Sequence, residues 1–314
     1  MKSEFKYSAH FAILISSFIF GLNLPITKTL LQENWITPFG MTMVRMLGAA
    51  LAFWLTSLFV PKEKVAPKDL WILFLCSILG VNANQGFFVI GLANTSPIDS
   101  GLIVTITPIL VMLLAAAVLK EPITFKKVIG VMVGGLGVLL IVLSGIHSET
   151  RMASWWGNAL CIASCTVYAC YLVIIRPLAQ RYNTITIMKW MFLFAVVMSL
   201  PFFGKELISA RVFTSDTNFG AVWRLIYVVF GATFVSYLLV PVALKNLRPT
   251  TVGMYNYLQP IVATVTTIAL GLDTMRWEIP VAAALVFVGV YLVVKSKSRQ
   301  DVLEEQRTVG NNDG

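Results

Sequence analysis

Residues 97–108 read PIDSGLIVTITP, and residues 249–260 read PTTVGMYNYLQP. Each stretch has a proline, a glycine four residues later and a second proline at its end. The likeness continues on both sides of the two stretches, where corresponding positions hold Asn94 and Asn246, Phe125 and Trp277, and Gly137 and Gly289. A pattern that returns after about 150 residues indicates a duplicated structural unit.

The composition places this duplicated unit in a lipid bilayer. Of the 314 residues, 57% are hydrophobic and 12% are charged, and the mean hydropathy is +0.80. This leaves too little polar surface for a soluble globule. Mostly apolar runs of about 18 residues or more can cross roughly 30 Å of hydrocarbon as helices. We therefore predict an all-α membrane protein with ten transmembrane helices, at residues 9–30, 38–60, 70–92, 98–119, 126–145, 154–175, 184–203, 221–244, 250–271 and 278–295.

The basic residues predict how the chain is oriented. With the N-terminus in the cytoplasm, about sixteen lysines and arginines fall on the cytoplasmic side and six on the other, as the positive-inside rule requires. Five spans in each unit then invert the second copy. The sequence thus predicts two inverted five-helix repeats at 1–148 and 149–295, with both termini cytoplasmic and a disordered tail at 296–314. The first apolar segment is long, lacks a clear cleavage site and precedes nine others, so we expect it to be retained.

The charges, cysteines and histidines argue against a nucleic-acid-binding protein, an enzyme and a metal site. The net charge of +9 comes from residues that alternate by loop, so no nucleic-acid surface is predicted. No span carries a His/Asp/Glu cluster, no phosphate-binding glycine loop occurs, and His10 and His147 lie near span ends. We expect no catalysis, metal or cofactor. All four cysteines fall inside spans, which favours small core residues over a metal site or a disulfide: Cys76, Cys161, Cys165 and Cys170.

The residues that carry the duplication resemble the EamA branch of the drug/metabolite transporter superfamily. The likeness covers about residues 9–295 and lies in the ten-span pattern, the two proline-bounded segments, Glu121-Pro122 after the fourth span and the glycine-rich fifth and tenth spans. It implies a bacterial inner-membrane exporter of amino acids or other small metabolites, with a central cavity lined by both halves. The second copy has Asp273-Thr274 in place of Glu121-Pro122, so a symmetric role for the two acids is not implied.

Polar and aromatic side chains inside the spans are the candidate substrate contacts. Hydrogen-bonding groups at membrane depth are costly when they face lipid, and aromatic walls with a few amides suit a ligand with an apolar body and a polar head. The alternatives are bonds between helices or, for tyrosines, positions at the membrane interface. On this basis we predict substrate binding by Asn23, Asn82, Gln85, Thr107, Tyr168, Tyr171, Tyr237, Tyr255, Asn256 and Gln259.

Helical spacing adds detail to these predictions. Asn82 and Gln85 are expected to share one helix face, with Asn84 pointing elsewhere, and residues 255 and 259 are likewise expected on one face. Pro25 is expected to kink its helix beside Asn23, either at a functional site or as a packing feature. The second proline of each repeated stretch should break its helix about midway.

Three charged residues each have two alternative interpretations. Arg45 lies roughly 10 Å along the second span from its outer end, where it either recognises an anionic substrate group or has a structural role, bonding helix-end carbonyls or reaching the outer interface. Asp99 either stabilises the positive end of a helix dipole or, as a group at the boundary of its span, couples transport to an ion, because no Asp or Glu falls well inside a span. Glu121, near Lys126 and Lys127, is expected to form a helix cap or a surface ion pair.

These features together predict a secondary transporter that exports small polar or amphipathic metabolites, such as amino acids, by alternating access. The alternative is a channel or facilitator for small solutes, and an intramembrane enzyme is a distant third. The expected partners are a small-molecule substrate and the bilayer. Gly130 and Gly134 form a small-residue pair that permits close helix packing, within the chain by default or in a homodimer.

Overall fold

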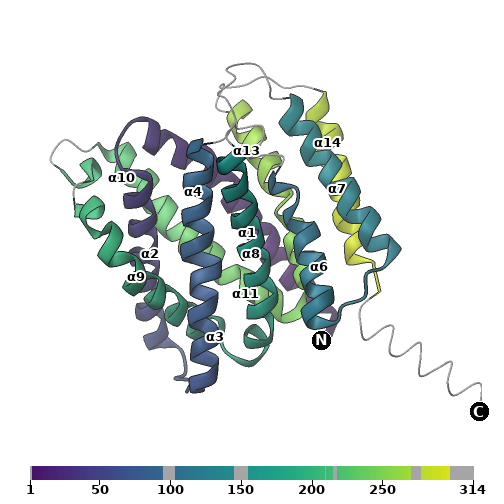
Figure 1. The fold of residues 1–314 in the computed structure, drawn as a ribbon, viewed down its shortest axis with the longest axis horizontal. Coiled ribbons are helices and arrows are strands. Elements are labelled where there is room, and N and C mark those ends of the chain that lie inside the picture. Colours follow the sequence, from purple (N-terminus) through teal and green to yellow (C-terminus); the bar gives the residue numbers. More distant parts are fainter. Residues whose placement is uncertain are drawn as a thin grey trace, which may run out of the picture.

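The computed structural model is a bundle of helices (Figure 1). It describes residues 2–94, 103–144, 155–208, 210–214, 218–269 and 277–297, and no β-strand occurs within these ranges. Its first half contains α1 (Lys2–Gln32), α2 (Pro38–Thr56), α3 (Pro67–Ser77), α4 (Asn84–Asn94), α6 (Thr107–Leu119) and α7 (Phe125–Ser144). Its second half contains α8 (Trp155–Arg181), α9 (Thr184–Ile208), α10 (Phe219–Ile226), α11 (Ser236–Asn246), α12 (Pro249–Tyr255), α13 (Leu258–Ala269) and α14 (Glu278–Val294).

The all-helical class is confirmed. Among the described residues, seven helices are long and apolar enough to cross a membrane, and α6 and α14 are shorter apolar helices. The predicted segment 98–119 includes residues 98–102, which lie outside the described part of the chain, as does the end of the segment 250–271. The membrane-length helices are Tyr7–Leu31, Pro38–Phe59, Pro67–Phe88, Phe125–Leu143, Trp155–Arg181, Thr184–Ile208 and Phe219–Asn246.

Two long helices contain a π-helical segment, η2 (Ile78–Ala83) between α3 and α4 and η4 (Tyr227–Val235) between α10 and α11. A π-helix closes its hydrogen bonds over one more residue than an α-helix does. It therefore rotates the side chains that follow it, relative to an unbroken α-helix. Such segments are rare and are frequent at functional sites.

Two further breaks occur where the repeated prolines predict them. Residues 105 and 106 form a turn before α6, with a hydrogen bond from the Ile106 amide to the Ile103 carbonyl at 3.0 Å. Residues 256 and 257 separate α12 from α13, with the Tyr257 amide bonded to the Met254 carbonyl at 3.1 Å. Pro108 and Pro260 cause these breaks because a proline lacks the amide hydrogen and clashes with the carbonyl four residues earlier.

Glycines bring α7 and α14 into direct backbone contact, and the two helices run side by side in Figure 1. A Cβ atom on Gly130 would lie 2.7 Å from the Gly289 carbonyl oxygen, and one on Gly137 would lie 2.7 Å from the Ala282 carbonyl oxygen. Gly134 faces the Tyr257 ring. The small residues of α7 thus serve packing within the chain.

Glu121, which the sequence predicts in a helix cap or a surface ion pair, instead belongs to a buried ion pair. The Glu121 side chain is 4% exposed, and it accepts hydrogen bonds from Lys127 Nζ at 3.3 Å and from Arg176 at 2.7 Å. Lys127 also donates to the Pro122 carbonyl at 2.9 Å. The sequence placed Glu121 among nearby lysines but gave no sign of Arg176, which α8 brings in from 55 residues away.

We predict that Gly289→Ala destabilises the protein by about 1–3 kcal/mol, the usual cost of overpacking a tight contact. The added Cβ would lie 2.5 Å from the Gly130 carbonyl oxygen and 2.8 Å from Gly134 Cα, and neither backbone atom can move away independently. Thermal unfolding of the purified protein in detergent measures the change. Gly86→Ala is the matched control, since its Cβ would meet nothing within 4 Å, and an equal melting temperature for the two variants would contradict the prediction.

We also predict that Glu121→Gln lowers stability by about 3–5 kcal/mol, because removing one partner of a buried ion pair leaves Lys127 charged and uncompensated. Glu33→Gln is the control. Its pair with Arg224 is exposed, with side-chain accessibilities of 44% and 38%, and such pairs contribute about 0–1 kcal/mol. The same melting experiment compares the two variants, and a smaller effect for Glu121→Gln than for Glu33→Gln would refute this role.

Candidate functional site

Residues within or close to the irregular segments line a cavity of about 180 Å³. Its wall combines amides and hydroxyls with aromatic rings, and it draws on elements from both halves of the chain. The lining residues are Phe20, Asn84, Gln85, Phe88, Val104, Thr107, Ser164, Cys165, Tyr168, Tyr171, Tyr237, Val240, Asn256 and Gln259.

Seven of the ten predicted substrate-binding residues line this cavity. They come from α4, α6, α8, α11, the 256–257 turn and the first turn of α13, and they are Gln85, Thr107, Tyr168, Tyr171, Tyr237, Asn256 and Gln259. A cavity of this size can hold a small ring, since an engineered cavity of about 150 Å³ binds benzene. The mixed wall therefore suits a small ligand with both apolar and polar parts.

The predicted arrangement of the asparagines is wrong. Asn82 turns away from the cavity and donates to Ser199 Oγ at 3.1 Å and to the Ala195 carbonyl at 3.3 Å, joining η2 to α9. Asn84 and Gln85 line the cavity in its place. The reason is the π-helical segment at 78–83, which shifts the helix phase that the sequence spacing assumes.

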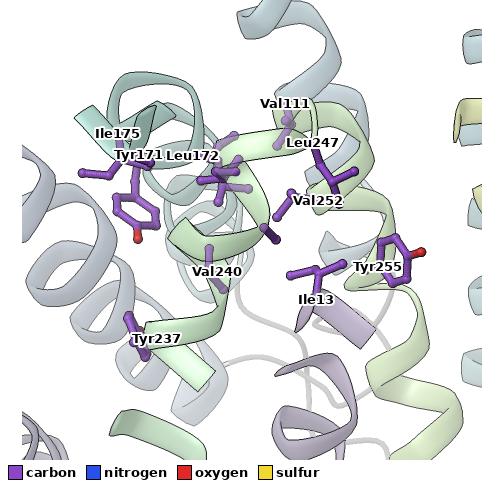
Figure 2. Packing of buried hydrophobic residues seen from close by; sticks show 14 of the residues in the cluster. Ile13, Val111, Tyr171, Leu172, Ile175, Tyr237, Val240, Leu247, Val252 and Tyr255 are labelled. Atoms are coloured by element: carbon purple, nitrogen blue, oxygen red, sulfur yellow. The ribbon is translucent and has the colours of Figure 1, made fainter. Parts of the chain in front are cut away.

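Asn23 and Tyr255 also lie outside the cavity wall. Asn23 is 7% exposed, and its amide oxygen accepts a hydrogen bond from Thr27 at 3.1 Å within α1. The Tyr255 hydroxyl meets His10 Nδ1 at 3.0 Å, and Figure 2 shows its ring apart from Tyr171 and Tyr237. The prediction that residues 255 and 259 share one face is wrong because the chain turns between them, after α12 ends.

The two proline breaks meet each other at the cavity. Tyr257, in the second break, donates its hydroxyl hydrogen to the carbonyl oxygen of Thr105, in the first, at 2.7 Å. The residues beside them, Val104, Thr107, Asn256 and Gln259, line the cavity. The turns thus present polar side chains to the cavity while their backbone groups are bonded within the protein.

Arg45 lies behind this wall, beside a void of about 10 Å³ whose lining includes Gln85 and Tyr237. Its Nε donates to Thr233 Oγ1 at 2.9 Å, and its NH1 donates to Gln85 Oε1 at 3.3 Å. The Gln85 amide nitrogen then donates to the Tyr237 hydroxyl oxygen at 3.2 Å. Arg45 is therefore linked to the cavity through two side chains that line it.

Three polar or reactive cavity residues were not predicted as substrate contacts: Asn84 was expected to point elsewhere, Cys165 was expected in the core, and Ser164 was not singled out. Asn84 donates to Ser164 Oγ at 3.0 Å, and the serine hydroxyl donates to the Asn84 carbonyl at 2.9 Å. For Ser164 and Cys165 the only sequence signal was their position on hydrophobic spans. Serine and cysteine fit apolar helices too readily for that signal to stand out.

The described part of the chain holds no group of three or more His, Cys, Asp or Glu residues that could bind a metal ion. The described lining of the cavity contains no carboxylate. Asp99, the candidate coupling residue, lies outside the described residues.

Known proteins share both the sequence pattern and the fold. The EamA-like transporter family matches the chain at residues 7–143 and 155–295. An uncharacterized transporter of Archaeoglobus fulgidus is 24% identical over 274 residues, which cover 87% of this chain and 95% of that protein. A probable terminal-alkyne amino-acid exporter of Streptantibioticus cattleyicolor is 24% identical over 162 residues, covering 52% of this chain and 53% of that protein. A crystal structure with 16% identity and a TM-score of 0.71 covers 90% of this chain and 98% of its own.

The family match spans most of the chain and confirms the resemblance seen in the proline-bounded segments. Its relatives are named as transporters, and the apolar helices are long enough to cross a membrane. The protein is a membrane transporter rather than an enzyme, and it belongs to the EamA-like transporter family.

Proposed function

We propose that the chain is a secondary transporter that exports amino acids or related small metabolites by alternating access through the 180 Å³ cavity. The observation that carries this proposal is a cavity of mixed aromatic and amide character, built from both halves of a transporter-family chain. The amino-acid class is supported by the name of the Streptantibioticus relative, whose match covers about half of each chain.

Two contacts support ten spans arranged as two inverted repeats. Gln85 bonds Tyr237, and Tyr257 bonds the carbonyl of Thr105, and each pair is separated by 152 residues. This is the spacing between the two proline-bounded stretches. A residue that touches its own counterpart lies near the axis that relates two copies, so these contacts favour a symmetric core around the cavity. Inverted repeats around such a site can exchange conformations and open it to either side.

The basic residues support an orientation with both termini in the cytoplasm, and the family resemblance supports a bacterial inner-membrane location. The described cavity wall has no carboxylate that could carry a proton. Transport is then facilitated, driven by exchange, or coupled through a boundary group such as Asp99.

The transport proposal predicts flux of L-amino acids in proteoliposomes that contain the purified chain. Gln259→Ala removes an amide of the cavity wall and should slow transport at least tenfold, provided that the variant inserts normally. Asn94→Ala is the control, because Asn94 is an exposed amide that bonds the Ile90 carbonyl of its own helix. Radiolabelled counterflow across an amino-acid panel measures both variants. Flux no greater than in empty liposomes would contradict the proposal, and single-channel currents would point to a channel instead.

Coupling through Asp99 is tested separately. Asp99→Asn removes the titratable carboxylate, so gradient-driven accumulation should fall to the level of passive exchange. Accumulation under an imposed pH or sodium gradient measures this, with counterflow as the control for retained transport. Full gradient-driven accumulation by the variant would rule out this coupling.

A further inference from the structure

We propose that the substrate presents a carboxylate to the hydroxyl groups of Tyr237 and Tyr171, and that Arg45 supplies the positive charge of this subsite through Gln85. The inference rests on the proposed function, because it names the chemistry of the group that the transport cavity receives. It assigns Arg45 as a positioning residue behind the cavity wall rather than as a direct ligand.

The direction of the hydrogen bonds carries the argument. An arginine side chain only donates hydrogen bonds, so the Gln85 atom that Arg45 NH1 approaches at 3.3 Å must be the amide oxygen. The amide nitrogen then faces Tyr237 and donates to its hydroxyl oxygen at 3.2 Å. The Tyr237 hydroxyl hydrogen is therefore left to donate, and Tyr237 lines the cavity. A group that accepts this hydrogen is what the subsite selects.

The Nε group of Arg45 is bonded to the second π-helical segment, η4. Its Nε donates to Thr233 Oγ1 at 2.9 Å, and Thr233 uses its own hydrogen on the Val228 carbonyl at 2.8 Å. Thr233 can then serve Arg45 only as an acceptor, which holds the guanidinium in place. The Tyr237 ring is held in turn by edge-to-face contacts with Phe20 at 5.9 Å and Phe192 at 5.2 Å between ring centroids.

The charge of Arg45 has no compensating carboxylate within the described part of the chain. Ion pairs there include those of Lys127, Arg176, Arg181 and Arg224 with Glu121, Asp69 and Glu33, and none that the described residues show involves Arg45. The described cavity wall adds no acid. A positive charge in an apolar surrounding is unfavourable without a counter-charge. A ligand anion in the adjacent cavity would provide one.

The Tyr171 hydroxyl is a second, independent indication that the ligand carries a hydrogen-bond acceptor. The residue is 1% exposed, and its hydroxyl is buried without a hydrogen-bond partner in the described structure. Figure 2 shows the hydroxyl oxygen directed away from α8, and Tyr171 lines the same cavity as Tyr237. Buried hydroxyl groups without partners are rare in proteins. A ligand oxygen that accepts from both tyrosines would satisfy this one.

The rest of the wall indicates what the carboxylate is attached to. Phe20, Phe88, Val104 and Val240 line the cavity with apolar surface, which suits an aromatic or aliphatic body. Suitable probes are 3-phenylpropionate, its neutral amide 3-phenylpropionamide, and the cation 3-phenylpropylamine, because the three share one body and differ in the head group.

Binding of each probe to the purified full chain in detergent, measured by calorimetric titration, tests the inference. The wild type should bind 3-phenylpropionate at least tenfold more tightly than the amide or the amine. Tyr237→Phe removes only the hydroxyl and should weaken 3-phenylpropionate about tenfold or more, as expected for a hydrogen bond to a charged group, while the amine is unaffected. Tyr255→Phe is the matched control, since its hydroxyl bonds His10 outside the cavity, and it should change no affinity.

Gln85→Glu tests the contribution of Arg45 without removing the arginine. The new carboxylate replaces the amide in nearly the same shape and pairs with Arg45, so the preference for 3-phenylpropionate over its amide should disappear. This variant also decides the matter if Tyr237→Phe does not fold.

The inference is overturned if the amine binds as tightly as 3-phenylpropionate, if 3-phenylpropionate does not bind, or if Gln85→Glu keeps the wild-type preference. It is likewise overturned if Tyr237→Phe folds and binds 3-phenylpropionate with wild-type affinity. Amino-acid flux in proteoliposomes separates these results from the proposed function. If the protein transports amino acids but shows no preference for the carboxylate probe, the proposed transport function is retained and only the proposed carboxylate subsite is rejected.

Discussion

Hydrogen bonding of the backbone is the constraint on which this structure depends. A bilayer offers no water to unpaired amide and carbonyl groups, so a chain that crosses it stays helical unless it is buried in protein or lines a cavity. Within the described part of the chain, and apart from two short 3-10 helices at Ser57–Phe59 and Arg211–Phe213, four departures from α-helix are η2, η4 and the turns at 105–106 and 256–257. All four lie at the cavity or behind its wall, so the irregular backbone and the candidate site form one feature.

Each departure has a particular consequence for the site. The π-helix η2 turns Asn84 and Gln85 toward the cavity, and η4 holds Thr233 where it can accept from Arg45. The two proline breaks place Thr107, Asn256 and Gln259 on the wall, and Tyr257 ties them together through the Thr105 carbonyl. An uninterrupted bundle of the same residues would direct several of these side chains into helix contacts instead.

Buried charges in the described structure occur in two contrasting environments, one with and one without a charge of opposite sign. Near the α6–α7 connection, Glu121 is buried against Lys127 and Arg176, so the charges compensate one another. Beside the cavity, Arg45 bonds only neutral groups in the described structure. The first arrangement suits a fixed contact between helices, whereas the second leaves an electrostatic preference for a ligand to satisfy.

The sequence alone determined the helical class, the family and half of the cavity wall, because hydropathy, proline spacing and duplication are local or periodic properties. It identified seven residues of the cavity wall from their polarity within apolar segments. It misplaced Asn82 and Asn84, because a π-helix changes the phase of a helix without a mark in the spacing. It missed the separation of Tyr255 from Gln259 because the four-residue helical spacing was applied across a proline break.

Contacts between distant segments were decided by tertiary structure alone. Arg176 reaches Glu121 from another helix, Arg45 meets Gln85 and Thr233, and Ser164 pairs with Asn84. A periodic pattern shows which face of a helix is polar, but it does not show which neighbour that face meets. The partners of Arg45, and with them the direction of the hydrogen bonds toward the cavity, emerge only when the helices are packed together.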